Sequence, residues 1–186
     1  STLFPYTTLF RSRTGPPAYK KDGDSMVAVN PMTTGYRLPT DAEWEWVARY
    51  ENGGKLRRYP WGDALPVAPN SGNYADNTGR IVLQDVIPGY DDGYAVSAPV
   101  GKFPPNPLGL YDIGGNVAEW AHDYYAVSID AAQVAVDPLG PAQGKHHVIR
   151  GSSWKQASVT DLRLSARDFG DAPRNDVGFR IARYVE

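Results

Sequence analysis

The sequence predicts an α+β fold in which a few short helices pack on a small, mainly antiparallel sheet. Three observations lead to this prediction. One clearly amphipathic helix occurs in the first third of the chain, a long stretch rich in proline and glycine follows it, and three strand-like segments joined by turns end the chain. With 186 residues, the chain has the length of a single domain that buries a substantial core.

The first two elements are predicted from turn and capping patterns. KKDGDS has the composition of a tight turn and lies between residues 18–19 and the alternating run MVAV, which predicts a short β-hairpin. A helix is expected over residues 41–51, because Thr40 can act as its N-cap and Glu43, three residues later, completes a capping box. The sequence NGG at 52–54 ends it.

The later elements are predicted with less regular patterns. Residues 59–109 show no sustained period, which indicates a long ordered loop region held by aromatic packing or bound ions. A second short helix is expected over residues 117–122, because NVAEWA contains no helix breaker. Strands are expected within HHVIRGSSW, DLRLSARDF and DVGFRIARYV, with turns near Gly151, Gly170 and Arg174.

Composition excludes several classes of function. A formal net charge of -2 and a pI near 5.9 provide no basic surface for nucleic acid. No apolar run is long enough for a membrane span. The 186 residues contain no cysteine, which excludes disulfides, thiolate metal ligands and a thiol nucleophile within them. Residues 1–12 resemble a translated sequencing adapter, so we expect a non-native or disordered leader and a domain over 13–186.

Three blocks together carry a family resemblance. They are GYRLPTDAEWEWVAR at 35–49, APVGKFPPNPLGLYDIGGNVAEW at 98–120, and VIRGSSW with RLSARDFGDAPRNDVGFRIAR within 148–183. In this order and spacing they resemble the formylglycine-generating enzyme family, also called the sulfatase-modifying factor domain, over residues 16–184. The resemblance implies an irregular, loop-rich, C-type lectin-like fold. Domains of the family normally begin further upstream, so we expect an N-terminally truncated chain.

The resemblance also identifies a departure from the family. Its best-known members oxidise a substrate cysteine to formylglycine with copper held by two cysteines that follow a G-G-S-W/Y motif. The matching stretch is GSSWKQASVTD, which contains no cysteine. Thiolates are the soft ligands that select Cu(I), and neither Lys155 nor Gln156 replaces them. We therefore expect no copper and no cysteine oxidation by that mechanism.

Calcium is the inorganic partner that the resemblance implies, because the family holds Ca²⁺ with oxygens of its irregular loops. Each of two sites would combine side-chain oxygens with backbone carbonyls. Without the resemblance, Asp92-Gly93 reads as a turn and Glu119 as a surface carboxylate. Carried over residue by residue, the first site comprises Asn73, Tyr74, Asp92 and Tyr94, and the second comprises Asp112, Gly115, Val117 and Glu119.

Other chemistry-bearing residues have structural interpretations. Adjacent His146 and His147 on a strand point to opposite faces and do not readily share an ion. Acids crowd the last loops, and nothing in their spacing requires a paired-carboxylate hydrolase. Burial is favoured over sugar stacking for Trp44, Trp120 and Trp154, and Tyr111 is also expected inside. Ion pairing is favoured over substrate binding for Arg37, Arg150, Arg167 and Arg180.

The leading hypothesis is a calcium-stabilised binding module for a peptide, protein or small molecule, a bacterial pseudoenzyme that is secreted or periplasmic. The family resemblance implies export from the cytoplasm, to compartments where free calcium is high. One alternative is a family enzyme with cysteine-independent oxidative chemistry, similar to the periplasmic enzymes of pyoverdine maturation. Another is a structural subunit of an envelope assembly. The expected ligand-binding residues are Ser153, Trp154, Lys155, Gln156 and Arg174.

Overall fold

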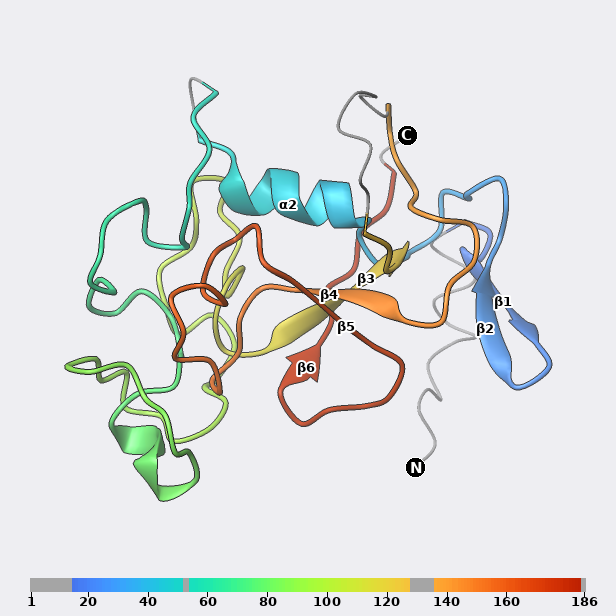
Figure 1. The fold of residues 1–186 in the computed structure, drawn as a ribbon. Helices are drawn as coiled ribbons and strands as arrows, with labels where there is room; N and C mark the ends of the chain where they lie inside the picture. The colour runs from blue at the N-terminus through green and yellow to red at the C-terminus, as the bar shows by residue number, and fades with distance from the viewer. Residues whose placement is uncertain (1–14, 52–53, 128–135, 185–186) are drawn as a thin grey trace. The chain divides into compact units, whose positions relative to one another are not determined.

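The computed structural model describes residues 15–51, 54–127 and 136–184, and the predicted leader at 1–12 lies outside them (Figure 1). The chain divides into two compact units. The smaller combines Ser1–Pro39 with Arg180–Glu186, and the larger is Thr40–Phe179. All residues of the candidate sites belong to the larger unit.

The smaller unit contains the predicted hairpin. Strands β1 (Tyr19–Asp22) and β2 (Ser25–Ala28) pair antiparallel, and the register leaves a two-residue turn that begins with Gly23. The φ angle of Gly23 is 59°, a left-handed conformation that glycine adopts without a steric cost. The prediction made from KKDGDS is therefore confirmed.

Helix α2 (Asp41–Arg49) has the capping box that the sequence predicts. The Glu43 amide donates to Thr40 Oγ1 over 3.1 Å, and the Thr40 amide donates to Glu43 Oε2 over 2.8 Å. The helix buries Trp44 and Ala48 and ends two residues before the predicted limit of 51. At Tyr50 the backbone is already extended, with ψ at 132°.

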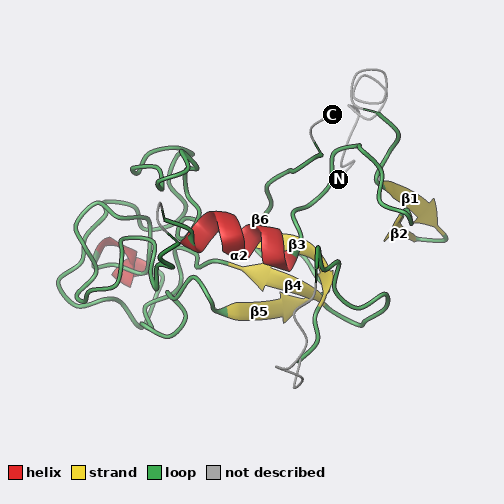
Figure 2. Cartoon of the chain, turned by 90° about the horizontal axis from the view of Figure 1, so that it is seen from above, coloured by secondary structure: helices red, strands yellow, loops and turns green. Residues whose placement is uncertain are grey.

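The larger unit also contains a four-stranded sheet in the order β5-β4-β3-β6. Strand β3 pairs antiparallel with β4, β4 pairs antiparallel with β5, and only β6 runs parallel to β3. Helix α2 lies against β3 and β4 (Figure 2). The mainly antiparallel sheet is confirmed, with strands β3 (Ala118–Tyr124), β4 (His147–Arg150), β5 (Arg167–Gly170) and β6 (Val177–Gly178).

Two predictions of local structure were wrong. Residues 117–122 were expected to be helical, but strand β3 occupies this position between β4 and β6. Pairing with β4 and β6 satisfies the backbone of β3 and outweighs the helix preference of its alanines and glutamate. The first part of DLRLSARDF forms turns, and the strand starts only at Arg167. Leu162 and Leu164 are nevertheless fully buried.

Aromatic packing, one of the two predicted alternatives, supports the long loop region. Between residues 59 and 109 the regular element is the 3-10 helix η1 (Thr78–Ile81), and the remainder forms turns, bends and a single bridge. A cluster of buried side chains lies beneath these turns, and each large member contributes about 1.5–3 kcal/mol when it leaves water. The cluster comprises Tyr59, Val67, Tyr74, Ile87, Tyr90 and Leu162.

The aromatic predictions have mixed outcomes. Trp44 is fully buried and Trp154 is 6% exposed, whereas Trp120 is only partly buried. The expectation for Tyr111 was wrong, because 47% of its surface is exposed. No helix in the described ranges has the length and apolarity that crossing a bilayer requires.

Candidate functional site

The first candidate calcium site is organised around the Asp92 carboxylate. Its Oδ2 accepts from the Tyr74 amide over 2.9 Å, and its Oδ1 accepts from the Tyr94 amide over 3.0 Å. The adjacent Asn73 is fully buried, and its amide nitrogen donates to Val96 O over 2.8 Å. The loop therefore brings Asn73, Tyr74, Asp92 and Tyr94 together, although they are up to 21 positions apart in sequence (94 − 73).

The oxygen chemistry of this loop fits a hard cation. Asn73 Oδ1 is buried and has no hydrogen-bond donor among the described residues. Burial raises the pKa of Asp92 from 3.8 to about 6, more than the two backbone hydrogen bonds lower it. A cation between an orphaned amide oxygen and a desolvated carboxylate would satisfy both groups. The residues of the first site thus suit calcium on an observation independent of the family resemblance.

Asp76 is a residue of this loop that sequence reasoning missed. It is fully buried, and its Oδ2 accepts from the Asp92 amide over 2.7 Å while its Oδ1 accepts from the Gly79 amide over 2.9 Å. Asp76 therefore connects the turn that presents Asp92 to the backbone of η1. A signal was present in the sequence, because an aspartate three positions before a glycine is typical of a side-chain-capped turn.

The second candidate calcium site lies where the 112–117 turns lead into β3. Asp112 Oδ2 accepts from the Gly101 amide over 2.7 Å, and Glu119 Oε2, from a carboxylate that is 6% exposed, accepts from the Trp44 indole over 2.7 Å. Among the described residues, neither candidate site contains a group of three or more His, Cys, Asp or Glu side chains that could hold a metal ion. Calcium at Asp112, Gly115, Val117 and Glu119 would depend on carbonyl oxygens as well as on the two acids, and it remains a prediction.

Gly115 joins the two candidate calcium sites. Its φ of 107° lies outside the range favoured by other residues, and a Cβ there would lie 2.8 Å from Tyr74 Cε1 and 3.1 Å from Asn73 O. The following amide, of Asn116, donates to Asn73 O over 2.7 Å. Any larger side chain at position 115 would therefore separate the two loops.

Three backbone hydrogen bonds hold the segment after β4 against these loops. The Gly115 amide donates to Ser152 O over 3.0 Å, and the Trp154 amide donates to Asn116 O over 2.9 Å. The Ala75 amide donates to Gln156 O over 3.1 Å. Because residues 152–156 include four of the five expected ligand-binding residues, order in the calcium loops is coupled directly to this segment.

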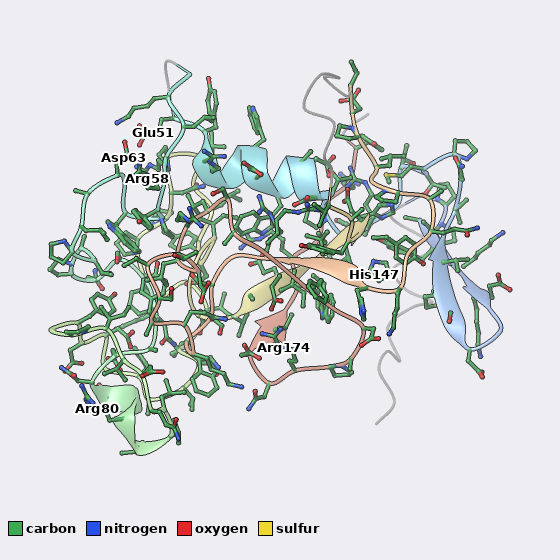
Figure 3. All side chains as sticks on the ribbon, in the orientation of Figure 1. Glu51, Arg58, Asp63, Arg80, His147 and Arg174 are labelled. Atoms are coloured by element: carbon green, nitrogen blue, oxygen red, sulfur yellow. The ribbon has the colours of Figure 1, made fainter. Side chains whose placement is uncertain are left out.

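The expected ligand-binding residues gather around the Asp176 carboxylate. Ser153, Lys155 and Arg174 contact it directly, and Gln156 contacts Ser153. Ser153 Oγ lies 3.2 Å from Asp176 Oδ2, and Lys155 Nζ lies 3.7 Å from Asp176 Oδ1 and 5.1 Å from the centre of the Trp154 ring. Arg174 reaches the same carboxylate from the loop between β5 and β6 (Figure 3). We call this group the Asp176 cluster, comprising Ser153, Lys155, Gln156, Asp168, Arg174, Asn175 and Asp176.

The charges of the Asp176 cluster reinforce one another. Arg174 donates through Nε and Nη2 to Asp176, over 3.2 and 2.9 Å, and through Nη1 to Asp168 over 2.6 Å. These hydrogen bonds hold the pKa of Arg174 above its ordinary value. Burial raises the pKa of Asp176, but hydrogen bonds and charge from Arg174, together with Lys155, bring it below its ordinary value. Asp176 is therefore a buried carboxylate, and its cations lie at the surface.

Gln156 occupies the cluster in a fixed orientation. Its Oε1 accepts from the Ser153 amide over 2.6 Å and from Ser153 Oγ over 2.5 Å. The backbone N–H of Ser153 can only donate, so the Gln156 amide group cannot be reversed without losing that hydrogen bond and placing two donors against each other. The Gln156 side chain therefore ties the two ends of the Ser153–Gln156 turn together through hydrogen bonds.

The remaining polar predictions are resolved by separate contacts. His146 lies 3.4 Å from Asp171 Oδ2, whereas His147 stacks on Tyr124 at 4.3 Å between ring centres. The two adjacent histidines therefore have different partners, as the strand geometry predicts. Arg150 and Arg167 are ion-pair partners, as expected, and both bind the Asp41 carboxylate.

Comparisons with known proteins agree on one family. The sulfatase-modifying factor enzyme 1-like domain matches residues 9–185. The formylglycine-generating enzyme of Bos taurus is 37% identical over 155 residues, which cover 80% of this chain. Treponema denticola variable protein 1 has a similar structure, with a TM-score of 0.65 and 33% identity over 84% of this chain. PvdO from Pseudomonas aeruginosa has a TM-score of 0.60 and 27% identity over 82%.

The chain spans only part of each of these proteins. It covers 39% of the bovine enzyme, 50% of the Treponema protein and 54% of PvdO. The similarity includes the segment that follows β4, where this chain has Lys155 and Gln156 and no cysteine.

Proposed function

Because the chain belongs to the sulfatase-modifying factor enzyme 1-like domain family, we propose that it is a formylglycine-generating-enzyme-like binding module and not a cysteine oxidase. One observation carries the proposal. The segment where the family resemblance implies two copper-binding cysteines holds a hydrogen-bonded cluster of Ser153, Gln156 and Asp176. The cluster has no soft ligand for Cu(I), yet Lys155 and Arg174 reach the surface from it.

The ligand of this module is a peptide, a protein or a small molecule that contacts Ser153, Lys155, Gln156 and Arg174 above Trp154. Trp154 is 6% exposed and therefore acts as the floor on which Lys155 rests, rather than as a stacking surface. The floor is rigid, since both its amide and the neighbouring Gln156 carbonyl are hydrogen-bonded to the loops beneath. A preorganised site of this kind reduces the entropy lost on binding.

Calcium stabilises the scaffold in this proposal. Asn73 and Asp92 supply side-chain oxygens at the first site, with the carbonyls of Tyr74 and Tyr94, and a second ion binds near Asp112 and Glu119. The orphaned Asn73 Oδ1 is the main support for the first site. We also propose a periplasmic or extracellular location, where calcium is plentiful, and fractionation of cells that express the full gene checks it.

Oxygen uptake tests the proposal that the module is not a cysteine oxidase. The full chain is reconstituted with Cu(I) and supplied with a cysteine-containing peptide in an oxygen electrode. We expect no uptake above that of the peptide with free copper, and no stoichiometric Cu(I) binding. Copper-dependent turnover would refute the proposal. In parallel, an array of peptides and small molecules is screened for binding to the intact chain. If no member of the array binds, the binding role is refuted.

The likeness to PvdO favours a second candidate function, a family enzyme with oxidative chemistry that needs no cysteine. This enzyme would use the same surface at Ser153, Lys155 and Gln156. It differs from the binding module in consuming oxygen with a peptide or siderophore-type substrate. Uptake that requires Lys155 but no copper would select this candidate.

A further inference from the structure

We infer that the ligand of the Asp176 cluster carries a monovalent carboxylate, an inference that rests on the proposed function and names its ligand class. It follows from which hydrogen-bonding groups of the cluster are already used. Groups that are satisfied internally hold the site in shape, and exposed groups with hydrogens to spare are available to a ligand.

The amide nitrogen of Gln156 is a donor that faces outward. Its oxygen accepts from the Ser153 backbone amide over 2.6 Å, a group that can only donate, so Nε2 is at the opposite end of the side-chain amide. Residues in the described ranges offer Nε2 no acceptor, and it is not among the buried polar atoms that lack a partner. Two N–H groups at this position are therefore open to solvent.

The two cations of the cluster add further donors. Lys155 Nζ donates to Asn175 Oδ1 and lies near Asp176 Oδ1, which leaves one of its three hydrogens. Arg174 uses one hydrogen on each of its three nitrogens for Asp168 and Asp176, which leaves one on each Nη. About a third of each side chain is exposed, with 35% for Lys155 and 34% for Arg174. The open side of the site therefore presents mainly donors, and its ligand must supply acceptors.

The charge balance restricts the ligand further. Two cations and two carboxylates, Asp168 and Asp176, leave the cluster without net charge. A dianion such as phosphate would place two negative charges beside both carboxylates, and a neutral carbonyl would offer a single uncharged acceptor. A monovalent carboxylate offers two coplanar oxygens, one for an ammonium or guanidinium and one for the Gln156 amide. The ligand carboxylate belongs either to a small organic acid or to the C-terminus of a peptide.

Titration of the ¹⁵N-labelled full chain tests this inference, with the side-chain amide signals of Gln156 as the readout. The probes are acetate, N-acetylalanine, N-acetylalaninamide, inorganic phosphate, and one tripeptide with a free or an amidated C-terminus. We expect saturable shifts with acetate, N-acetylalanine and the free tripeptide, and none with the neutral amides. Tighter binding of the tripeptide than of acetate indicates a peptide C-terminus, and equal binding indicates a small acid.

Matched variants assign the binding to the cluster. Lys155→Met keeps the aliphatic stem over Trp154 and removes the charge, and we expect it to weaken N-acetylalanine binding by about tenfold or more. Gln156→Ala should weaken it to a similar extent. The exposed controls Lys102→Met and Gln84→Ala should leave the affinity unchanged. Circular dichroism and the melting temperature identify any variant that fails to fold, and the wild-type titration alone then decides.

The outcomes separate this inference from the proposed function. If phosphate or the amidated probes shift the Gln156 signals as strongly as the carboxylates do, the ligand class is wrong and the binding module stands. If no probe shifts them at millimolar concentration, the carboxylate inference is overturned. The proposal that the chain is a binding module is refuted only if, in addition, no member of the peptide and small-molecule array binds.

Discussion

Two arginines in the same unit each bind two carboxylates, yet their surroundings differ. Arg150 is completely buried, with Nε 2.9 Å from Asp41 and Nη2 2.7 Å from Glu45. Its Nη1 donates to Ala166 O over 2.6 Å, and its guanidinium lies 5.0 Å from the centre of the Trp44 ring. Burial lowers the pKa of Arg150, although both acids oppose this effect.

Arg174 makes a similar set of ion pairs at the surface. Its hydrogen bonds with Asp176 and Asp168 raise its pKa, because they outweigh the smaller effect of desolvation. Arg150 connects α2 to β4 and presents no donor to solvent, whereas Arg174 retains hydrogens that face outward. The comparison teaches that ion pairing alone does not distinguish structure from function. The distinguishing property is whether donors remain available after the internal contacts are made.

Removal of Arg150 should have the largest effect on stability. In Arg150→Gln, Asp41 and Glu45 lose their fully buried cation and keep only the more exposed Arg167 and Arg49, and α2 loses its ion pairs with β4. We expect a loss of about 3–5 kcal/mol in the free energy of unfolding. Urea denaturation measures it, and exposed Arg163→Gln is the matched control. A loss as small as that of the control would show that the buried ion pairs do not stabilise the fold.

Asp123 gives the buried region a pH dependence. Burial raises its pKa from 3.8 to about 6, and the nearby Asp41 carboxylate acts in the same direction. The folded state therefore binds more protons than the unfolded state between these values, so this group contributes stability at low pH that is lost as the pH rises through about 6. The contribution is at most about 3 kcal/mol.

The variant Asp123→Asn tests this dependence. In the wild type the Asp41 amide donates to Asp123 Oδ2 over 2.7 Å, and an asparagine oxygen can still accept this hydrogen bond. We expect the melting temperature of the variant, relative to the wild type, to increase from pH 4 to pH 7. The exposed control Asp85→Asn should show no such trend. A difference between Asp123→Asn and the wild type that is constant across this range would contradict the assignment.

Calcium should stabilise the loops that support the Asp176 cluster. At a free concentration one hundred times the dissociation constant, binding to the folded state alone contributes about 2.7 kcal/mol. Differential scanning calorimetry with calcium or chelator measures the shift in melting temperature. Asp92→Asn should reduce the shift, and Asp85→Asn should preserve it. If calcium does not change the melting temperature of the wild type, the proposed sites are wrong.

Arg174→Gln should have the smallest effect on stability. The ion pairs of Arg174 are partly exposed and screened by solvent, and Lys155 remains beside Asp176. We expect a loss of about 1 kcal/mol or less in chemical denaturation. A loss comparable with that of Arg150→Gln would mean that the Asp176 cluster is a structural element and would remove the contrast between the two arginines.

Local signals predicted much of the fold. The capping box of α2 and the hairpin turn at Gly23 each depend on residues a few positions apart, so the sequence alone was sufficient. Strand β3 was missed because its conformation depends on pairing with β4 and β6, whose residues are distant in sequence. The prediction for Tyr111 was wrong, because its 47% exposure depends on tertiary packing that the local sequence does not specify.

The residues of the candidate site could be named from the sequence, whereas the contacts that bring them together could not, and their role in binding remains a prediction. The family resemblance indicated Ser153 to Gln156 and Arg174, and the structure brings them together. The roles of Asp76 and Asp176 could not be predicted, because each acts through burial and through contacts with distant segments. The fixed orientation of Gln156 likewise depends on a hydrogen bond from the Ser153 amide that composition and spacing do not specify.

The most direct test of the central claim is the affinity of a ligand recovered from the array for four proteins: wild type, Lys155→Met, Arg174→Gln and Lys102→Met. The account predicts that the first two variants lose about tenfold or more in affinity while remaining folded, and that Lys102→Met binds like the wild type. Equal affinity for all four proteins would place the ligand elsewhere and contradict the claim that the Asp176 cluster is a binding site.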